Sequence, residues 1–170
     1  MSNIIEFHDK TKTMSVNADK EKDTITTYYT FIPKVWDKIV PEDNNDKSDK
    51  YLVFFYLNFN EYEKHKISLS IRVGDFPDAE ERVRFVTQLS EAVKKSADSG
   101  LTVNSSSKKY MTIFKETIFL KYGKDEDCDL DDYETVTGKL IEAYNSPEVV
   151  KAFKVVDDVV RKFWVKKVLK

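Results

Sequence analysis

The sequence predicts an α+β fold of two layers, in which an antiparallel sheet of about four or five strands packs against three helices. Several segments are rich in β-branched and aromatic residues, and one alternates apolar and polar residues as a half-buried strand does. Three later segments carry apolar residues at helical spacing. With 170 residues, 41% of them hydrophobic, the chain is expected to form a single domain over residues 24–170. Residues 1–23 are expected to be a polar, partly flexible segment, with a short strand followed by a mobile stretch.

Four segments are expected to form the sheet, namely residues 24–32, 51–59, 66–73 and 109–120. The first ends before Pro33, which cannot continue a central ladder, and residues 34–40 could form one helical turn. The second segment is apolar on both faces and therefore suits a central strand. In the third, one face has Ile67, Leu69, Ile71 and Val73, and the other has Ser68, Ser70 and Arg72. The short connection between the second and third segments favours an antiparallel hairpin.

The first helix is expected to begin near Asp78, with Asp75 available as its N-cap and Pro77 tolerated in its first turn. Gly100 stands where such a helix would end. Its apolar stripe is expected to consist of Val83, Val86, Leu89, Val93 and Ala97.

Two further helices are expected after the acidic segment 125–134, separated by a break at Asn145. In the last helix Ser146 is a suitable N-cap and Pro147 occupies the first helical position. The apolar stripe of the earlier helix is Tyr133, Val136, Leu140 and Tyr144. That of the last helix is Val149, Phe153, Val156, Val160, Phe163 and Val168.

Charge and cysteine content point to a reducing, cytoplasmic location. Lys and Arg number 28 against 30 Asp and Glu, so the net charge of −2 indicates no particular partner. The lone Cys128 cannot form an internal disulfide, and the N-terminal residues lack the pattern of a signal peptide. The longest apolar run is far shorter than the about twenty residues of a membrane helix, so no membrane association is expected.

No metal or cofactor is expected, because the residues that such sites need are missing. His8, His65 and one cysteine cannot assemble a zinc site, and four glycines do not form a phosphate-binding loop. Asp125, Asp127 and Asp129 match three alternate ligand positions of a calcium loop. The positions of its Gly and bidentate Glu hold Leu130 and Val136, so the acidic segment 125–134 is better interpreted as a helix entrance.

Three hypotheses for function remain open, and the sequence favours a non-enzymatic role over an enzymatic one. The first is a protein-interaction module, binding a partner or a second copy through an aromatic sheet face formed by Tyr28, Tyr29, Phe54 and Tyr56. The second is nucleic-acid binding through a basic C-terminal helix carrying Arg161, Lys162, Trp164, Lys166 and Lys167. The third is a carboxylate-dependent hydrolase, which predicts at least two acids converging in a deep pocket with a raised pKa.

Residues 30–120 contain four stretches of interest, TFIPKVWD, SLSIRVGD, PDAEERVR and SKKYMTIFKETIF. These stretches resemble the C-terminal, non-nuclease portion of some bacterial proteins of the PD-(D/E)XK nuclease superfamily. No acid in the chain is followed by a lysine two positions later, so the nuclease residues of that family have no counterparts here. The resemblance implies an accessory or recognition module linked to phage, prophage or bacterial defence.

Overall fold

The computed structural model describes residues 12–19, 24–42, 51–60, 66–107, 109–119 and 133–165. For residues 12–19, 24–29, 59, 60, 66, 119 and 133–137 it describes only the backbone. The strands are β1 (Lys12–Asp19), β2 (Thr24–Phe31), β3 (Val53–Asn60), β4 (Lys66–Val73) and β5 (Met111–Phe119). The helices are the 3₁₀ turn η1 (Lys34–Trp36), α1 (Ala79–Lys95), α2 (Tyr133–Tyr144), α3 (Pro147–Val160) and the π-helical turn η2 (Arg161–Val165). Most of the acidic segment 125–134, together with His8, His65 and Val168, lies outside the described residues.

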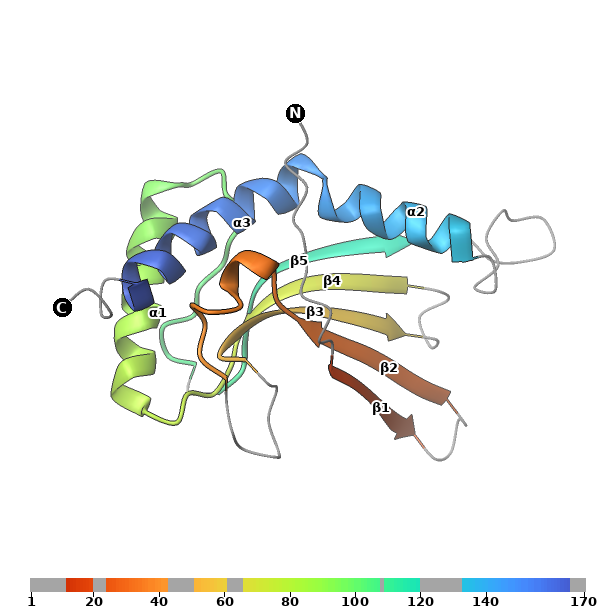
Figure 1. Ribbon diagram of the computed structural model, residues 1–170, viewed down its shortest axis with the longest axis horizontal. Coiled ribbons are helices and arrows are strands. Elements are labelled where there is room, and N and C mark those ends of the chain that lie inside the picture. Colours follow the sequence, from red (N-terminus) through yellow and green to blue (C-terminus); the bar gives the residue numbers. More distant parts are fainter. Residues whose placement is uncertain are drawn as a thin grey trace.

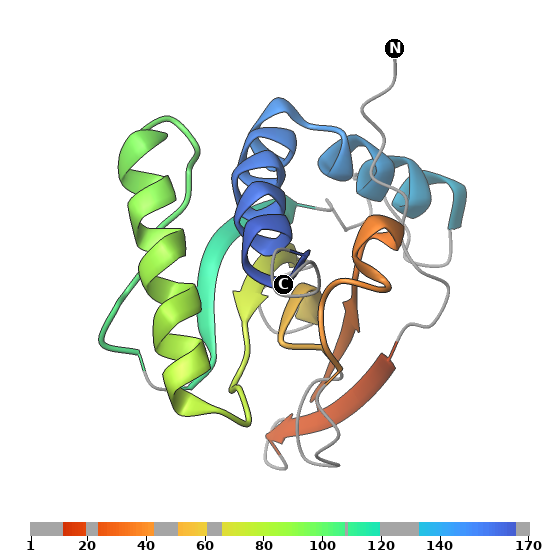
Figure 2. The same ribbon diagram turned by 60° about the vertical axis from the view of Figure 1, so that its left-hand side comes forward.

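The five strands form one antiparallel sheet in the order β1-β2-β3-β4-β5, so that each strand pairs with its neighbour in sequence. The helices lie along one side of this sheet, with α1 and α3 next to each other (Figures 1 and 2). This arrangement confirms the expected two-layer α+β fold, and all four expected strands are present. A fifth strand, β1, lies in the N-terminal segment, where a short strand was expected, and it forms one edge of the sheet.

The register of β3 and β4 decides which residues face the helices. Phe55 pairs with Ile71 and Leu57 pairs with Leu69, and all four of these side chains are buried. Alternation along a strand therefore places Phe54, Tyr56 and Asn58 on the opposite face. Because β3 is apolar at both sets of positions, only its pairing with the alternating strand β4 shows which set meets the helices.

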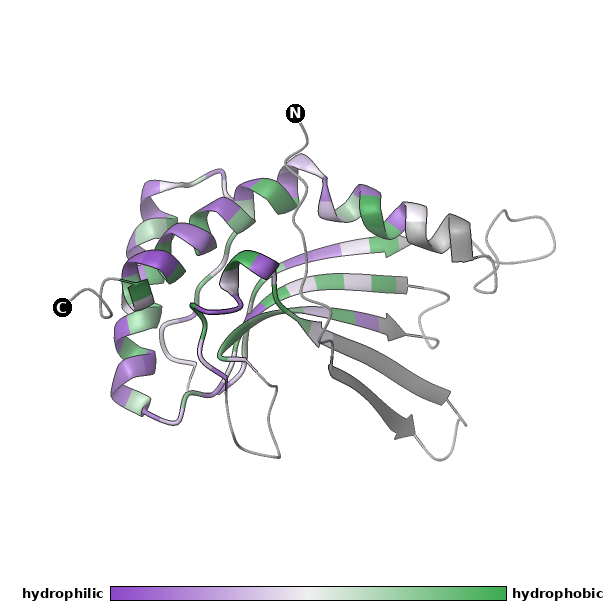
Figure 3. Ribbon diagram, viewed as in Figure 1, coloured by the Kyte–Doolittle hydropathy of each residue, from purple (hydrophilic) through white to green (hydrophobic). Residues whose placement is uncertain are grey.

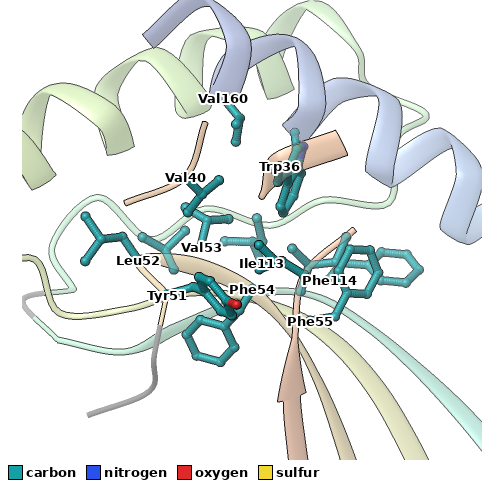
Figure 4. Packing of buried hydrophobic residues seen from close by; sticks show 14 of the residues in the cluster. Trp36, Val40, Tyr51, Leu52, Val53, Phe54, Phe55, Ile113, Phe114 and Val160 are labelled. Carbon is teal, nitrogen blue, oxygen red and sulfur yellow. The ribbon is translucent and has the colours of Figure 1, made fainter. Parts of the chain in front are cut away.

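The core between the sheet and the helices is rich in aromatic rings. Phe55 on β3 contacts Trp36 of η1 and Phe153 of α3, with ring centroids 6.2 and 6.3 Å apart. Figure 4 shows Trp36 and Val160 on the helix side of β3. The helices are amphipathic, with hydrophobic and hydrophilic residues alternating around α1 and α3 (Figure 3). Burial of these rings stabilises the packing of the helices onto one face of the sheet.

Helix α1 differs from the expectation at both ends and along its buried face. Asp78, and not Asp75, is the N-cap, because its carboxylate accepts hydrogen bonds from the backbone N–H groups of Glu80 and Glu81. The helix ends at Lys95, so Gly100 belongs to the following loop. The predicted stripe residue Val83 is 64% exposed. The buried face consists of Arg82, Phe85, Val86 and Leu89.

The two C-terminal helices agree more closely with expectation. α2 ends at Tyr144, and Ser146 caps α3 by accepting a hydrogen bond from the backbone N–H of Val149. Pro147 is the first residue of α3, where its missing N–H costs nothing. Val149, Val156 and Val160 are fully buried. The last helix is therefore fixed by a local cap and by its apolar stripe.

Candidate binding face of the sheet

The sheet face turned away from the helices is lined mainly by polar residues, and we call it the polar face. On β2 to β5 its register positions are Thr24, Thr26, Tyr28, Thr30, Phe54, Tyr56, Asn58, Asn60, Lys66, Ser68, Ser70, Arg72, Thr112, Lys115, Thr117 and Phe119. None of the helices that the structure describes packs on this face (Figures 1 and 2). Within this face Thr30, Phe54, Ser68 and Ser70 are buried, Tyr56, Asn58, Arg72 and Thr117 are half-buried, and Thr112 and Lys115 are exposed. The half-buried and exposed side chains are those that the face offers for other contacts.

Tyr56 lies at the centre of the polar face. It pairs with Thr30 on β2 and with Ser70 on β4, so one row across the sheet runs Thr30, Tyr56, Ser70. The guanidinium carbon of Arg72 lies 3.8 Å above the centre of the Tyr56 ring. This cation–π contact holds the guanidinium against the sheet.

Three buried polar atoms around Tyr56 have no hydrogen-bond partner in the part of the chain that the structure describes. They are Thr30 Oγ1, Asn58 Oδ1 and Arg72 Nε. Thr30 as a whole is only 1% exposed. Buried polar groups in proteins are nearly always hydrogen-bonded, because each unpaired group costs about 1–3 kcal/mol. A cluster of three around one tyrosine is therefore a candidate for ligand contact.

The polar face is positively charged. Arg72 and Lys115 occupy positions on it, and none of its positions on β2 to β5 holds an acid. On β1, Lys12 extends the central row beside Thr30, whereas Asp19, beyond a bulge, pairs with Thr24 at the far end. In a chain with nearly equal numbers of acids and bases, this separation of charge favours an anionic partner.

The aromatic set predicted for partner binding does not form one open patch. Tyr56 is half-buried on the polar face, but Phe54 is 0% exposed and so has no surface for a partner. Tyr28 pairs with Asn58 and Tyr29 pairs with Leu57, so these two positions belong to opposite faces of the sheet. Sequence reasoning found Tyr56 but missed Thr30, Asn58 and Arg72, which only the register places around it.

The basic set predicted for nucleic-acid binding is largely engaged within the fold. Trp164 is 6% exposed and stacks on Phe85 with ring centroids 5.1 Å apart, so its ring is not available for a base. Arg161 pairs with Asp157 at 2.9 Å, and Lys162 pairs with Asp158 at 2.8 Å. Lys166 and Lys167 lie outside the described residues. The described part of this surface is thus close to neutral.

A hollow of about 340 Å³ between β5 and the start of α3 is lined by three acids, Asp98, Glu116 and Glu148, and by two lysines, Lys115 and Lys151, among others. Burial raises the pKa of Glu116, and the neighbouring Glu148 adds to this, while a hydrogen bond from Ser146 opposes it. The hollow therefore has the neighbouring acids and the raised pKa that the hydrolase hypothesis predicts. Asp98 pairs with Lys151 at 3.3 Å, so two of the three carboxylates also have structural partners.

A groove of about 640 Å³ runs between α1 and α3. Its floor includes Ala92 and Val159, and its rim carries residues of both charges, such as Glu91 and Lys95. Mixed charge gives this groove no preference for an anionic or a cationic partner.

The described residues contain no group of three or more His, Cys, Asp or Glu side chains that could hold a metal ion. Among the described helices, none has both the length and the apolar character needed to cross a membrane.

Comparisons of the chain with protein-family models, with curated proteins and with solved structures found no match.

Proposed function

We propose that this protein is a non-enzymatic binding module that recognises an acidic surface of a partner protein through the polar face. The observation that carries the proposal is the charge of this face, which holds Arg72 and Lys115 without an acid at its positions on β2 to β5.

A protein partner is favoured over a nucleic acid by the state of the aromatic residues. Single-stranded nucleic acids bind by stacking bases on open rings. Here Arg72 already lies over the Tyr56 ring, and Trp164 is packed in the core. A role in phage, prophage or bacterial defence rests only on the sequence resemblance described above, and it stays a prediction.

Affinity capture with a charge-reversal variant tests the proposal. Lys115 is exposed and lies in the central row of the polar face, whereas Lys94 is an exposed lysine on α1, so Lys115→Glu and Lys94→Glu make the same charge change on different surfaces. Proteins captured from cells of the native host by the unmodified chain and by Lys94→Glu should be lost with Lys115→Glu. Capture that survives Lys115→Glu, or that disappears on nuclease treatment, would contradict the proposal.

A further inference from the structure

The polar atoms left unpaired around Tyr56 define the chemistry of a ligand. We propose that Arg72 is the anchor of a peptide-binding site, where it takes a carboxylate from an acidic segment of the partner while the half-buried Asn58 accepts a hydrogen bond from an N–H of the same segment. This inference deepens the proposed function and rests on it. It adds a specific residue and a specific chemical group to a surface so far defined by its charge.

The position of Arg72 suits a carboxylate. Its guanidinium carbon lies 3.8 Å from the centre of the Tyr56 ring, so the ring supports a planar group that matches the geometry of a carboxylate. Nε is unpaired, and an arginine edge that offers Nε and a terminal nitrogen can bind the two oxygens of a carboxylate together. Nε is shielded from water, so binding requires the half-buried side chain to turn toward the entering carboxylate, as side chains at interfaces commonly do.

Asn58 indicates a peptide and not a simple anion. It is half-buried and lies two residues from Tyr56 along β3. Its unpaired Oδ1 is an acceptor and needs an N–H donor. A peptide supplies backbone N–H groups beside its side-chain carboxylate, whereas phosphate or a free carboxylate ion does not.

The electrostatic surroundings point in the same direction. Lys115 lies one strand beyond Ser70 in the central row and is exposed, so it can attract an acidic segment toward Arg72. No acid on the described positions of β3 to β5 that share this face would compete for Arg72. The site therefore combines the exposed Lys115, which attracts the acidic segment, with the half-buried Arg72, which orients its carboxylate.

Binding of a short capped peptide of alternating glutamate and glycine, measured by calorimetry and by NMR shifts, tests the inference. The matching glutamine peptide should bind at least about tenfold more weakly, because it lacks the charge. Arg72→Lys keeps the charge but loses Nε and the planar guanidinium, and we expect affinity to fall about tenfold. Arg84→Lys, on the exposed side of α1, should leave binding unchanged.

Several results would overturn the inference. They are the absence of saturable binding of the glutamate peptide, unchanged binding to Arg72→Lys, or tighter binding of tripolyphosphate or a thymidine oligonucleotide than of the peptide. Circular dichroism and thermal melting verify that each variant is folded. If Arg72→Lys binds normally while Lys115→Glu still loses the captured partner, the carboxylate site is wrong and the proposed function stands. If Lys115→Glu also keeps the partner, the proposed function fails as well.

Discussion

The indole N–H of Trp36 donates a 2.8 Å hydrogen bond to Asp157 Oδ1 on α3, although the two residues are 121 positions apart in the chain. Trp36 is 0% exposed, and Asp157 also accepts hydrogen bonds from Arg161 one turn later. This carboxylate therefore joins the turn after β2 to the last helix of the helical layer.

Asp157→Ala should lower the free energy of unfolding by about 1–3 kcal/mol, because it leaves the buried indole N–H of Trp36 without an acceptor. Asp158→Ala is the matched control, since it removes an exposed ion pair with Lys162 and should cost less than about 1 kcal/mol. Urea denaturation of both variants measures the difference. Equal losses would show that the Trp36 hydrogen bond does not stabilise the fold.

A second long-range connection passes through Arg82, which is 5% exposed. Its guanidinium donates to the backbone carbonyls of Gly74, Ser107 and Lys109, and so joins α1 to the end of β4 and to the loop before β5. Burial lowers the pKa of Arg82, and the nearby Asp75 partly opposes this.

Arg82→Met should destabilise the protein by about 2–4 kcal/mol, because three carbonyls lose their donor. Arg84→Met, an exposed change on the same helix, should stay within about 0.5 kcal/mol of the unmodified protein. Thermal and urea unfolding provide the comparison. A small effect of Arg82→Met would mean that water or other groups replace the guanidinium.

Two glycines should respond in opposite directions to alanine. Gly100 has a φ of 74°, a left-handed conformation that costs other residues about 1–2 kcal/mol, so Gly100→Ala should destabilise the fold. Gly138 lies inside α2 with open space around it, so Gly138→Ala should stabilise the helix by about 0.5–1 kcal/mol. Urea unfolding midpoints of the two variants, measured under the same conditions, test both predictions. If both substitutions stabilise the protein, or both destabilise it, one of the two predictions is wrong.

Glu116 should make stability depend on pH. Its pKa in the folded state is raised, mainly by burial, so the folded state holds this proton more tightly than the unfolded state does. The contribution of Glu116 to stability is therefore fully present below the unfolded pKa and is lost as pH rises through the folded pKa.

Glu116→Gln removes this titration, so the variant should gain stability relative to the unmodified protein on going from pH 4 to pH 7. Exposed Glu142→Gln on α2 is the control. Urea midpoints at the two pH values measure the shift. The raised pKa of Glu116 would be contradicted if both variants gained the same stability relative to the unmodified protein between pH 4 and pH 7. It would also be contradicted if Glu116→Gln lost stability relative to the unmodified protein over this range.

The sequence alone determined the elements whose signals are local. The alternation of Ile67, Leu69 and Ile71 with serines predicted β4, and Ser146 followed by Pro147 predicted the start of α3, because strand period and helix capping depend on residues a few positions apart. At α1 the same local reasoning chose Asp75 over Asp78, since both acids precede the helix and only the backbone geometry selects one.

Only the tertiary structure decided which residues meet. β3 is apolar on both faces, so its pairing with β4 was needed to separate Phe55 in the core from Tyr56 on the polar face. The burial of Arg82 and the contact of Arg72 with Tyr56 likewise arise from chain segments brought together by folding. Local sequence patterns encode strands and helices, but a binding face is made by register between strands, and register is a property of the whole sheet.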